Sequence, residues 1–214
     1  MTDPNTLEQL HLQTEECLKC ALGESRTNLV FGHGNADADI VFIGEAPGFN
    51  EDKQGVPFVG AAGKLLTELL AGIGMDREDV YIANVLKCRP PGNRDPLPEE
   101  VAACKPVLFE QLAIINPKVV VTLGAHATRT ILGRDVSISK VHGTTFQVDG
   151  YTVFPIYHPA AALYARATKE LLEEDFRALK EFLAADDPAA PAKRPAEATA
   201  GETAGEDSTQ LGLF

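Results

Sequence analysis

Four short apolar runs, each followed by turn-forming and polar residues, constrain the fold of this chain more than any other feature. Continuous apolar runs of this length are typical of strands that are buried on both faces of a sheet. Helical patterns separate or follow them, and strands that alternate with helices favour parallel pairing. We therefore predict an α/β fold with three layers, α/β/α, around a central, mostly parallel four-stranded sheet. The predicted strands are Asp39–Ile43, Val80–Val85, Lys118–Leu123 and Thr152–Tyr157, and the predicted helices Gly63–Ile73, Leu97–Ile115, Ala125–Leu132 and Thr168–Ala185.

The segments that follow these strands contain polar side chains and turns. They include Glu45 in GEAPG, Asn84, His126 and His158. Ligands of such sheets bind beyond the carboxyl ends of the strands, so we expect a pocket at this edge. Between TTFQV and YTVFPIY, the pair Asp149-Gly150 is typical of a tight hairpin turn and predicts one local antiparallel pair.

The acidic charge of the chain is concentrated at its two ends. The net charge of the 214 residues is −12, but residues 1–16 and 186–214 each contribute −4. This balance excludes a protein that coats nucleic acid by bulk electrostatics, while it permits contacts by a few cations in loops. The chain shows neither a secretory signal nor an apolar run long enough to span a bilayer. We expect a cytoplasmic, nucleoid-associated monomer with no membrane partner.

Residues 186–214 differ in composition from the domain that we predict over residues 1–185. They are rich in Ala, Pro, Gly, Thr and Glu, which predicts a disordered acidic tether. The tether contains QLGLF, that is Gln210, Leu211, Leu213 and Phe214. Either this segment packs back on the domain, or it is a docking motif. It resembles the pentapeptide with which many bacterial repair and replication proteins bind the sliding clamp.

Four cysteines form one close pair and two distant single positions. They are Cys17, Cys20, Cys88 and Cys104. Structural disulfides are not expected in a cytosolic chain. Four thiolates suffice for a tetrahedral zinc ion or a 4Fe-4S cluster, and the wide spacing of the second pair slightly favours the cluster. Four unrelated buried cysteines are the alternative.

Five ordered blocks within residues 17–183 resemble the family 4 (type-a) uracil-DNA glycosylases, which are the iron-sulfur members of that superfamily. The blocks are Cys17-x2-Cys20, GEAPGFNED at 44–52, PFVGAAGKLL at 57–66, Asn84 with CRPPGNR at 88–94 and then Cys104, and HPAA at 158–161. The resemblance implies a monofunctional enzyme that hydrolyses the N-glycosidic bond of deoxyuridine in DNA. The product, an abasic site, initiates base excision repair. It also implies a 4Fe-4S cluster on the four cysteines, with zinc as the weaker alternative.

The resemblance further implies how a flipped uracil is held. Phe58 stacks on the base, unless it is only a core residue. The Asn84 amide donates to O4 and accepts from N3–H, a pattern that cytosine cannot satisfy, although a capping role is the alternative. His158 and backbone N–H groups of the turn containing Glu45, Ala46 and Pro47 stabilise the negative charge that develops on O2.

Other assignments follow from the same resemblance. Better-known relatives have a water-orienting Asp where this chain has Ala46, so Glu45 is the candidate for orienting water or supporting the sugar cation. A structural hydrogen bond is the alternative for this residue. Glu51 is assigned to the space that the methyl group of thymine would fill. The remaining histidines, His11, His33, His126 and His142, are interpreted as surface or structural residues.

Contacts with DNA are assigned to loops near this edge. The surplus of cations in residues 87–105, which include Lys87, predicts phosphate contacts by Arg89 and Arg94. Leu163 fills the gap left by the flipped base, or is a helix-core leucine. Two other functions are alternatives. A relative that traps uracil-DNA covalently has a basic insertion that this chain lacks, and a non-catalytic Fe-S adaptor would not need Glu45, Phe58, Asn84 and His158 together.

Overall fold

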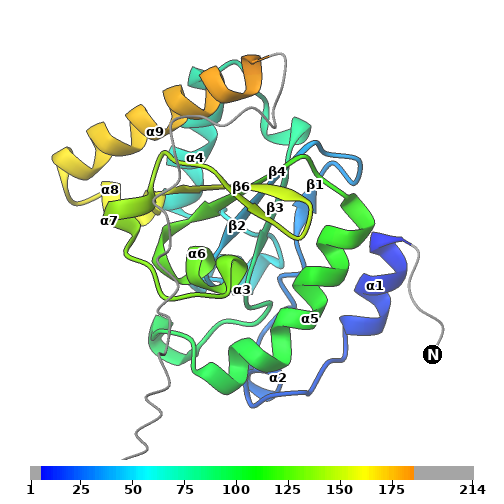
Figure 1. The fold of residues 1–214 in the computed structure, drawn as a ribbon. Coiled ribbons are helices and arrows are strands. Elements are labelled where there is room, and N and C mark those ends of the chain that lie inside the picture. The colour runs from blue at the N-terminus through cyan, green and yellow to red at the C-terminus, as the bar shows by residue number, and fades with distance from the viewer. Residues whose placement is uncertain (1–5, 186–214) are drawn as a thin grey trace, which may run out of the picture.

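A six-stranded mixed sheet lies at the centre of the computed structural model, which describes residues 6–185 (Figure 1). The strand order is β1-β3-β2-β4-β6-β5. The four inner strands are parallel to one another, whereas β1 and β5 pair antiparallel at the two edges. The strands are β1 (His33–Gly34), β2 (Ile40–Gly44), β3 (Tyr81–Asn84), β4 (Val119–Leu123), β5 (Phe146–Val148) and β6 (Tyr151–Ile156).

This sheet confirms the predicted α/β architecture and adds two edge strands to the four that were expected. The strand β5 is the first arm of the hairpin, whose turn residues Asp149 and Gly150 both have positive φ, 49° and 88°. Such a turn matches the twist of the flanking strands. The strand β1 has only two residues, both exposed, so it has no apolar pattern that a sequence could display.

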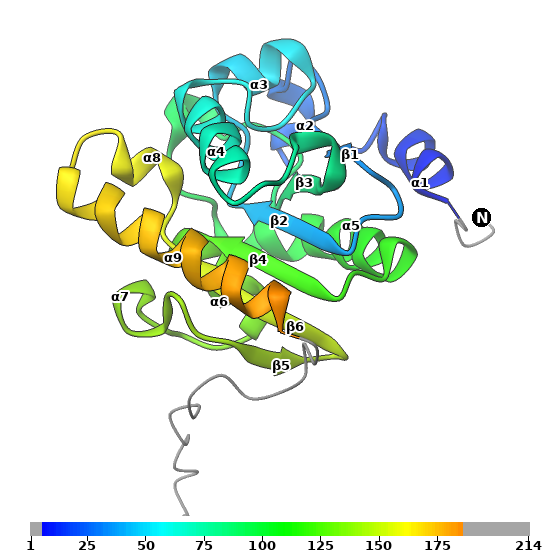
Figure 2. The ribbon, with the colours of Figure 1, turned by 90° about the horizontal axis from the view of Figure 1, so that it is seen from above.

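Two helical layers cover the sheet, because alternate residues of each inner strand point to opposite faces. Ile40 and Phe42 of β2 pack in one core with α4 and α9, whereas Val41 and Ile43 pack in another with α5 and α6 (Figures 1 and 2). The helices are α1 (Leu7–Thr14), α2 (Leu22–Ser25), α3 (Phe49–Gln54), α4 (Ala61–Gly72), α5 (Pro98–Ile115), α6 (Gly124–Leu132), α7 (Ile138–Val141), α8 (Pro159–Ala162) and α9 (Arg166–Ala184), with 3-10 turns η1 (Arg77–Asp79) and η2 (Pro91–Asn93).

The carboxyl ends of the parallel strands meet at one edge of the sheet. Gly44, the last residue of β2, pairs with Asn84, the last residue of β3. At β4 the chain turns directly into α6 at Gly124, whose φ is +84°. A Cβ atom there would lie 3.0 Å from the Cβ of His158, so a glycine allows this histidine to approach the end of β4.

Within residues 6–185, no helix combines the length and the apolar character that crossing a bilayer requires.

Candidate functional site

Three side chains assigned to the same site by sequence lie together at the carboxyl edge. A Cβ atom added to Gly44 would collide with Oδ1 of Asn84 and would lie 2.7 Å from the ring of Phe58, so both side chains contact this glycine. The ring centroids of Phe58 and His158 are 5.7 Å apart and their planes are inclined by 30°. The structure therefore brings an amide, an aromatic ring and an imidazole into one cluster.

Asn84 has an unusual environment for an amide. The residue is 2% exposed, and its Oδ1 atom is buried without a hydrogen-bond partner. Among the described side chains, only Nη1 of Arg77 shares this condition. A buried amide oxygen without a partner costs about 1–3 kcal/mol. The cost is offset if a ligand donates a hydrogen bond to it.

The loop that holds Phe58 is fixed by backbone contacts. Phe58 has a positive φ of 54°, which is uncommon for a bulky residue. Oε1 of Glu51 accepts hydrogen bonds from the backbone N–H groups of Val59 (3.0 Å) and Gly60 (2.9 Å), just before α4 begins. Gly63 allows α4 to pack against the Phe58 backbone, where a Cβ atom would collide. Glu51 thus holds the loop that positions the ring.

The geometry of His158 fixes its tautomer. Its Nδ1 atom accepts a hydrogen bond from the backbone N–H of Ala160 at 3.1 Å, at the start of α8. The neutral imidazole must then have its proton on Nε2. Burial lowers the pKa of His158 to about 4, so the ring is neutral near pH 7. His158 is therefore a neutral donor through Nε2.

Sequence reasoning missed a polar cluster around Glu45. Nε2 of His126, on α6, lies 3.9 Å from Glu45 Oε2 and 3.8 Å from Asp95 Oδ2. Burial is the main cause that raises the pKa of Glu45, while His126 opposes this effect and Asp95 adds to it. His126 had been interpreted as surface or structural, although its position after β4 placed it at this edge. No sequence pattern pointed to Asp95.

The turn after β2 is anchored to the segment after β3. The backbone carbonyls of Gly44 and Glu45 accept hydrogen bonds from the N–H groups of Val85 (2.9 Å) and Leu86 (3.0 Å). Ala46 is half-buried and Pro47 is buried. These two backbone hydrogen bonds fix the turn to the segment that follows β3.

The two arginines assigned to DNA differ in their contacts. Both ends of the Arg94 guanidinium bind the buried carboxylate of Glu100, at 2.6 and 2.9 Å. Arg89 instead lies 5.1 Å from the ring of Phe49, a residue that is 49% exposed at the start of α3. Lys53 lies over the same ring at 4.4 Å. The sequence had not singled out Phe49 or Lys53.

Leu163 is the C-cap residue of α8, the short helix whose N-cap is His158. Its side chain is 40% exposed. The alternative of a helix-core leucine is therefore wrong. Its neighbour Tyr164 is 93% exposed and was not singled out by sequence. Two large apolar side chains thus protrude at the end of the short helix α8, which begins after His158.

The four cysteines line one cavity. Lys87 and Gly23 also line it, and all four cysteines are free. Burial is the main cause that raises the pKa of Cys88, to about 11, while Arg26 opposes the change. The Nη1 atom of Arg26 lies 3.7 Å from Cys88 Sγ. No three of the cysteine sulfur atoms lie within 4.8 Å of one another. The structure thus brings Cys17, Cys20, Cys88 and Cys104 around one cavity.

Lys87 is 1% exposed, and this corrects its inclusion among the loop cations available to DNA. Its ammonium donates to the Asn84 carbonyl (2.8 Å) and to Gln111 Oε1 (2.5 Å). Burial lowers the pKa of Lys87 to about 8, and the nearby Cys104 opposes the change. A side chain enclosed in this way does not reach a phosphate group.

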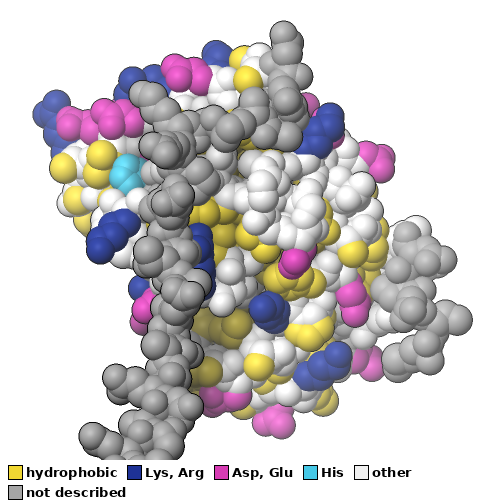
Figure 3. All heavy atoms as spheres, viewed as in Figure 1, with side chains coloured by type: hydrophobic (Ala, Val, Ile, Leu, Met, Phe, Trp, Pro, Cys, Tyr) yellow, Lys and Arg dark blue, Asp and Glu magenta, His cyan; other side chains and the backbone are white. Residues whose placement is uncertain are grey.

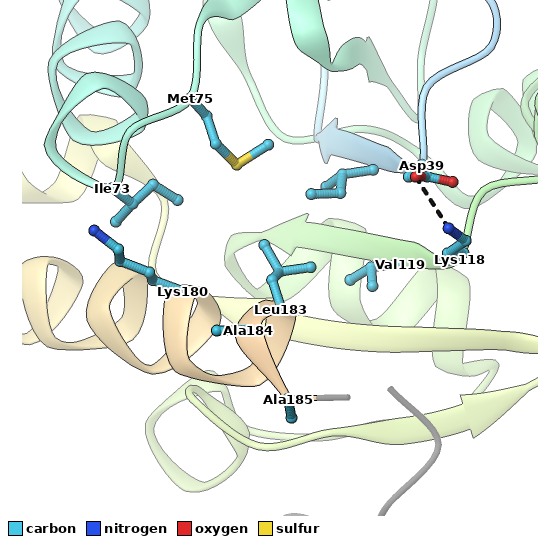
Figure 4. A pocket seen from close by; sticks show the side chains of 10 residues that line it. Asp39, Ile73, Met75, Lys118, Val119, Lys180, Leu183, Ala184 and Ala185 are labelled. Carbon is cyan, nitrogen blue, oxygen red and sulfur yellow. Dashed lines mark hydrogen bonds and ion pairs between the residues drawn. The ribbon is translucent and has the colours of Figure 1, made fainter. Parts of the chain in front are cut away.

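A second hollow lies at the opposite edge of the sheet, at the amino ends of β2 and β4 (Figure 4). Its lining includes Ile40, Val119, Met75 and an exposed ion pair between Lys118 and Asp39 at 3.1 Å. None of the predicted site residues lies there. The position of the hollow makes it unrelated to the carboxyl-edge cluster.

On the face drawn in Figure 3, outside the grey atoms, Lys and Arg side chains lie singly among acidic and neutral ones. This pattern agrees with contacts by individual cations. The predicted docking residues Gln210, Leu211, Leu213 and Phe214, with the rest of 186–214, lie outside the described residues.

Comparison of this sequence with known proteins shows the family to which the chain belongs. The model of the uracil DNA glycosylase superfamily matches residues 31–181. A type-4 uracil-DNA glycosylase of Sulfurisphaera tokodaii is 50% identical over 187 residues, covering 83% of this chain and 85% of that protein. One from Thermotoga maritima is 48% identical, covering 85% and 97%. A type-5 uracil-DNA glycosylase of Pyrobaculum aerophilum is 34% identical, covering 67% and 72%. The family resemblance is thus confirmed, and this chain belongs to the type-4 branch of the uracil-DNA glycosylase superfamily.

Proposed function

We propose that this chain hydrolyses the N-glycosidic bond of deoxyuridine in DNA and leaves an abasic site. The observation that supports this most strongly is the buried, unpartnered Oδ1 of Asn84 beside the ring of Phe58. Uracil has an N3–H donor on its pairing edge, whereas cytosine has an unprotonated N3. A uracil stacked on Phe58 can donate N3–H to Asn84 Oδ1, and a cytosine cannot.

Chemistry at the neighbouring histidine follows from its tautomer. As the glycosidic bond breaks, negative charge develops on uracil and positive charge on the sugar. Neutral His158 donates its Nε2–H to uracil O2, where the hydrogen bond strengthens as charge grows. The turn containing Glu45, Ala46 and Pro47 supplies backbone N–H groups to the same anion. No proton needs to be transferred to the leaving base.

Glu45 acts on the sugar side of the bond. An ionised carboxylate stabilises the cationic sugar and orients the water that attacks it. Burial is the main cause that raises the pKa of Glu45, so its carboxylate takes up a proton at a higher pH than an exposed glutamate does. We infer for Glu51 that it positions Phe58 through the N–H groups of Val59 and Gly60. Exclusion of thymine by Glu51 remains a prediction.

Arg89 and Leu163 form the DNA-binding part of the proposal. Arg89, stacked on Phe49, contacts a phosphate, while the exposed Leu163 enters the gap that the flipped base leaves in a duplex. Arg94, with its guanidinium bound to Glu100, contributes chiefly by holding the loop.

A 4Fe-4S cluster on Cys17, Cys20, Cys88 and Cys104 fits the donor set. All four thiols line one cavity, and four thiolates are the donor set of such a cluster. When bound, the cluster supplies iron-thiolate bonds that join residues 17–20 to the segments at 88 and 104. Its role in this proposal is structural.

The tether and its QLGLF segment complete the proposal. Binding of Gln210, Leu211, Leu213 and Phe214 to a sliding clamp raises the local concentration of a monomeric, cytoplasmic enzyme near DNA. A peptide of residues 201–214 is expected to bind purified clamp. Leu213→Ala with Phe214→Ala is expected to abolish that binding, and retained binding would contradict the assignment.

One assay tests the enzymatic proposal. Purified protein is incubated with a uracil-containing oligonucleotide, and alkali-labile abasic sites are measured; the matched cytosine and thymine oligonucleotides are controls. We expect product with uracil alone, and a loss of about 100-fold or more in Asn84→Ala. Absence of product from wild type would refute the proposal. A protein-DNA adduct that survives denaturation would instead favour covalent trapping.

A further inference from the structure

We propose that Lys87 is a positioning residue that links the cysteine site to Asn84, an inference that rests on the proposed function. Lys87 follows Asn84 by three residues and precedes Cys88 directly. Its ammonium donates to the Asn84 carbonyl at 2.8 Å, and its backbone N–H donates to Cys104 Sγ at 3.3 Å. One buried residue thus binds the backbone carbonyl of Asn84, whose side-chain amide is proposed to select uracil, and also contacts two of the cysteine positions.

The surroundings of Lys87 place it between the cysteine cavity and Asn84. The hydrogen-bond acceptors of its ammonium, the Asn84 carbonyl and Gln111 Oε1, are both neutral. A buried ammonium is costly without a compensating anion. Four thiolates around a metal or an iron-sulfur core retain net negative charge, and this site adjoins Lys87. The cysteine cavity therefore adjoins the same buried side chain that binds the Asn84 carbonyl.

Arg26, which contacts two of the cysteines that line this cavity, provides a contrast. Its guanidinium donates to the carbonyls of Cys17 (2.6 Å) and Glu15 (2.5 Å), and to Cys88 Sγ. These partners all belong to the cysteine segments. Arg26 therefore acts on retention of the bound group, whereas Lys87 also acts on uracil recognition.

The expected consequence is a loss of substrate positioning with the metal site retained. Lys87→Met keeps the length and apolar stem of the side chain but removes the bond to the Asn84 carbonyl. A hydrogen bond from a charged group of this kind corresponds to a loss of about 10- to 100-fold in kcat/KM. Lys180→Met, on the exposed surface of α9, is the matched control and is expected to retain the wild-type value.

A double-mutant cycle tests the link in the iron-loaded protein. Wild type, Lys87→Met, Asn84→Ala and the double variant are compared in single-turnover uracil excision, with iron content and thermal unfolding measured on each preparation. If Lys87 acts through Asn84, its replacement costs less than about twofold when Asn84 is already Ala. An equal loss in both backgrounds, or no loss in Lys87→Met, would overturn the link.

Gln111→Met keeps the proposal testable if Lys87→Met does not fold. It removes the second acceptor of the ammonium and leaves the charge in place, and its loss should likewise disappear in the Asn84→Ala background. An independent loss would again overturn the link. A wild type that releases no uracil would refute the proposed function itself, whereas an active wild type with additive losses would refute only this inference.

Discussion

Residues 84–88 connect the carboxyl edge of the sheet to the cysteine cavity. The polar groups of these two regions differ in whether they have hydrogen-bond partners within the protein. At the edge, Oδ1 of Asn84 is buried and has no partner. Around the cavity, the side chains of Arg26 and Lys87 bind backbone carbonyls, an amide oxygen and a sulfur atom. A buried acceptor without a partner can bind a ligand that associates and dissociates. Polar groups that are already hydrogen-bonded within the protein are typical around a group that stays bound.

This contrast separates the roles of the two regions. Replacements at the edge should lower activity and leave stability and iron content nearly unchanged. Replacements of the cysteines should first lower stability and iron content, whereas replacement of Lys87, which borders both regions, should lower activity with the iron retained.

The largest expected effect is that of His158→Ala. Removing the Nε2–H donor to uracil O2 is expected to reduce kcat about 100- to 1000-fold, as for loss of one oxyanion donor. The iron content should stay at the wild-type value. Steady-state excision of uracil measures the effect, and His33→Ala, on the exposed strand β1, is the control. A small loss in His158→Ala would remove the histidine from the chemistry.

Cys17→Ser tests the other side of the contrast. Losing one thiolate should release the bound group and destabilise the fold by roughly 3 kcal/mol, or about 10 °C in Tm for a chain of this size. Iron analysis and thermal unfolding measure the change. Unaltered iron content and Tm would show that Cys17 is not a ligand.

The pH dependence distinguishes Glu45 from His158. His158, whose pKa is lowered to about 4, stays neutral down to that pH, so it gives no inflection near 6.5. The Glu45 pKa is raised above 4.5, so activity should fall as pH decreases through that higher value. In Glu45→Gln, the residual activity should lose this inflection. Profiles of kcat/KM from pH 4.5 to 8 measure it, and an unchanged inflection would contradict the role of Glu45.

His158 also makes the free energy of unfolding depend on pH. Its folded pKa lies below the unfolded value of 6.5, so folded protein binds fewer protons than unfolded protein between those values. Stability is expected to fall as pH decreases from 6.5 towards 4. His158→Gln should weaken this dependence in denaturant titrations, and an equal slope in both proteins would contradict the burial of the ring.

Leu163→Ala should have a smaller effect that depends on the substrate. The side chain fills a gap that exists only in a stacked duplex, so we expect about a tenfold loss on double-stranded DNA and little change on single-stranded DNA. Leu12→Ala replaces another exposed leucine, on α1, and is the control. Equal losses on both substrates would argue against a wedge.

Arg89→Ala is expected to produce the smallest change. Loss of one phosphate contact lowers affinity a few-fold at moderate salt and reduces the slope of log K against log salt by about 1. Arg166→Ala, on the exposed start of α9, should leave the slope unchanged. An identical slope in Arg89→Ala would remove this arginine from the interface.

Local patterns predicted most of the fold. The strand β4 and the helix α5 begin within a residue of their predicted positions, because long apolar periods specify both their type and their length. The strand β1 has no such pattern and forms only because β3 offers it a free edge. The turn at Asp149-Gly150 was predicted because Asp-Gly is a residue pair that readily adopts the positive φ angles this turn requires.

The site was predictable where a residue type has a specific chemistry, as for Asn84 and His158. It was not predictable where position in space decides. Lys87 had been counted among the surface cations, yet packing places it under the sheet edge with 1% exposure. Similarly, the approach of His126 to Glu45 and Asp95 joins three separate segments. Such contacts depend on tertiary packing and have no local signature.

A crystal structure of the iron-loaded protein with uracil would show whether Asn84 recognises the base. We expect a uracil ring stacked on Phe58, with its N3 atom about 2.7–3.2 Å from Oδ1 of Asn84. Uracil bound elsewhere, or an Asn84 Oδ1 beyond hydrogen-bond distance of N3, would contradict this expectation.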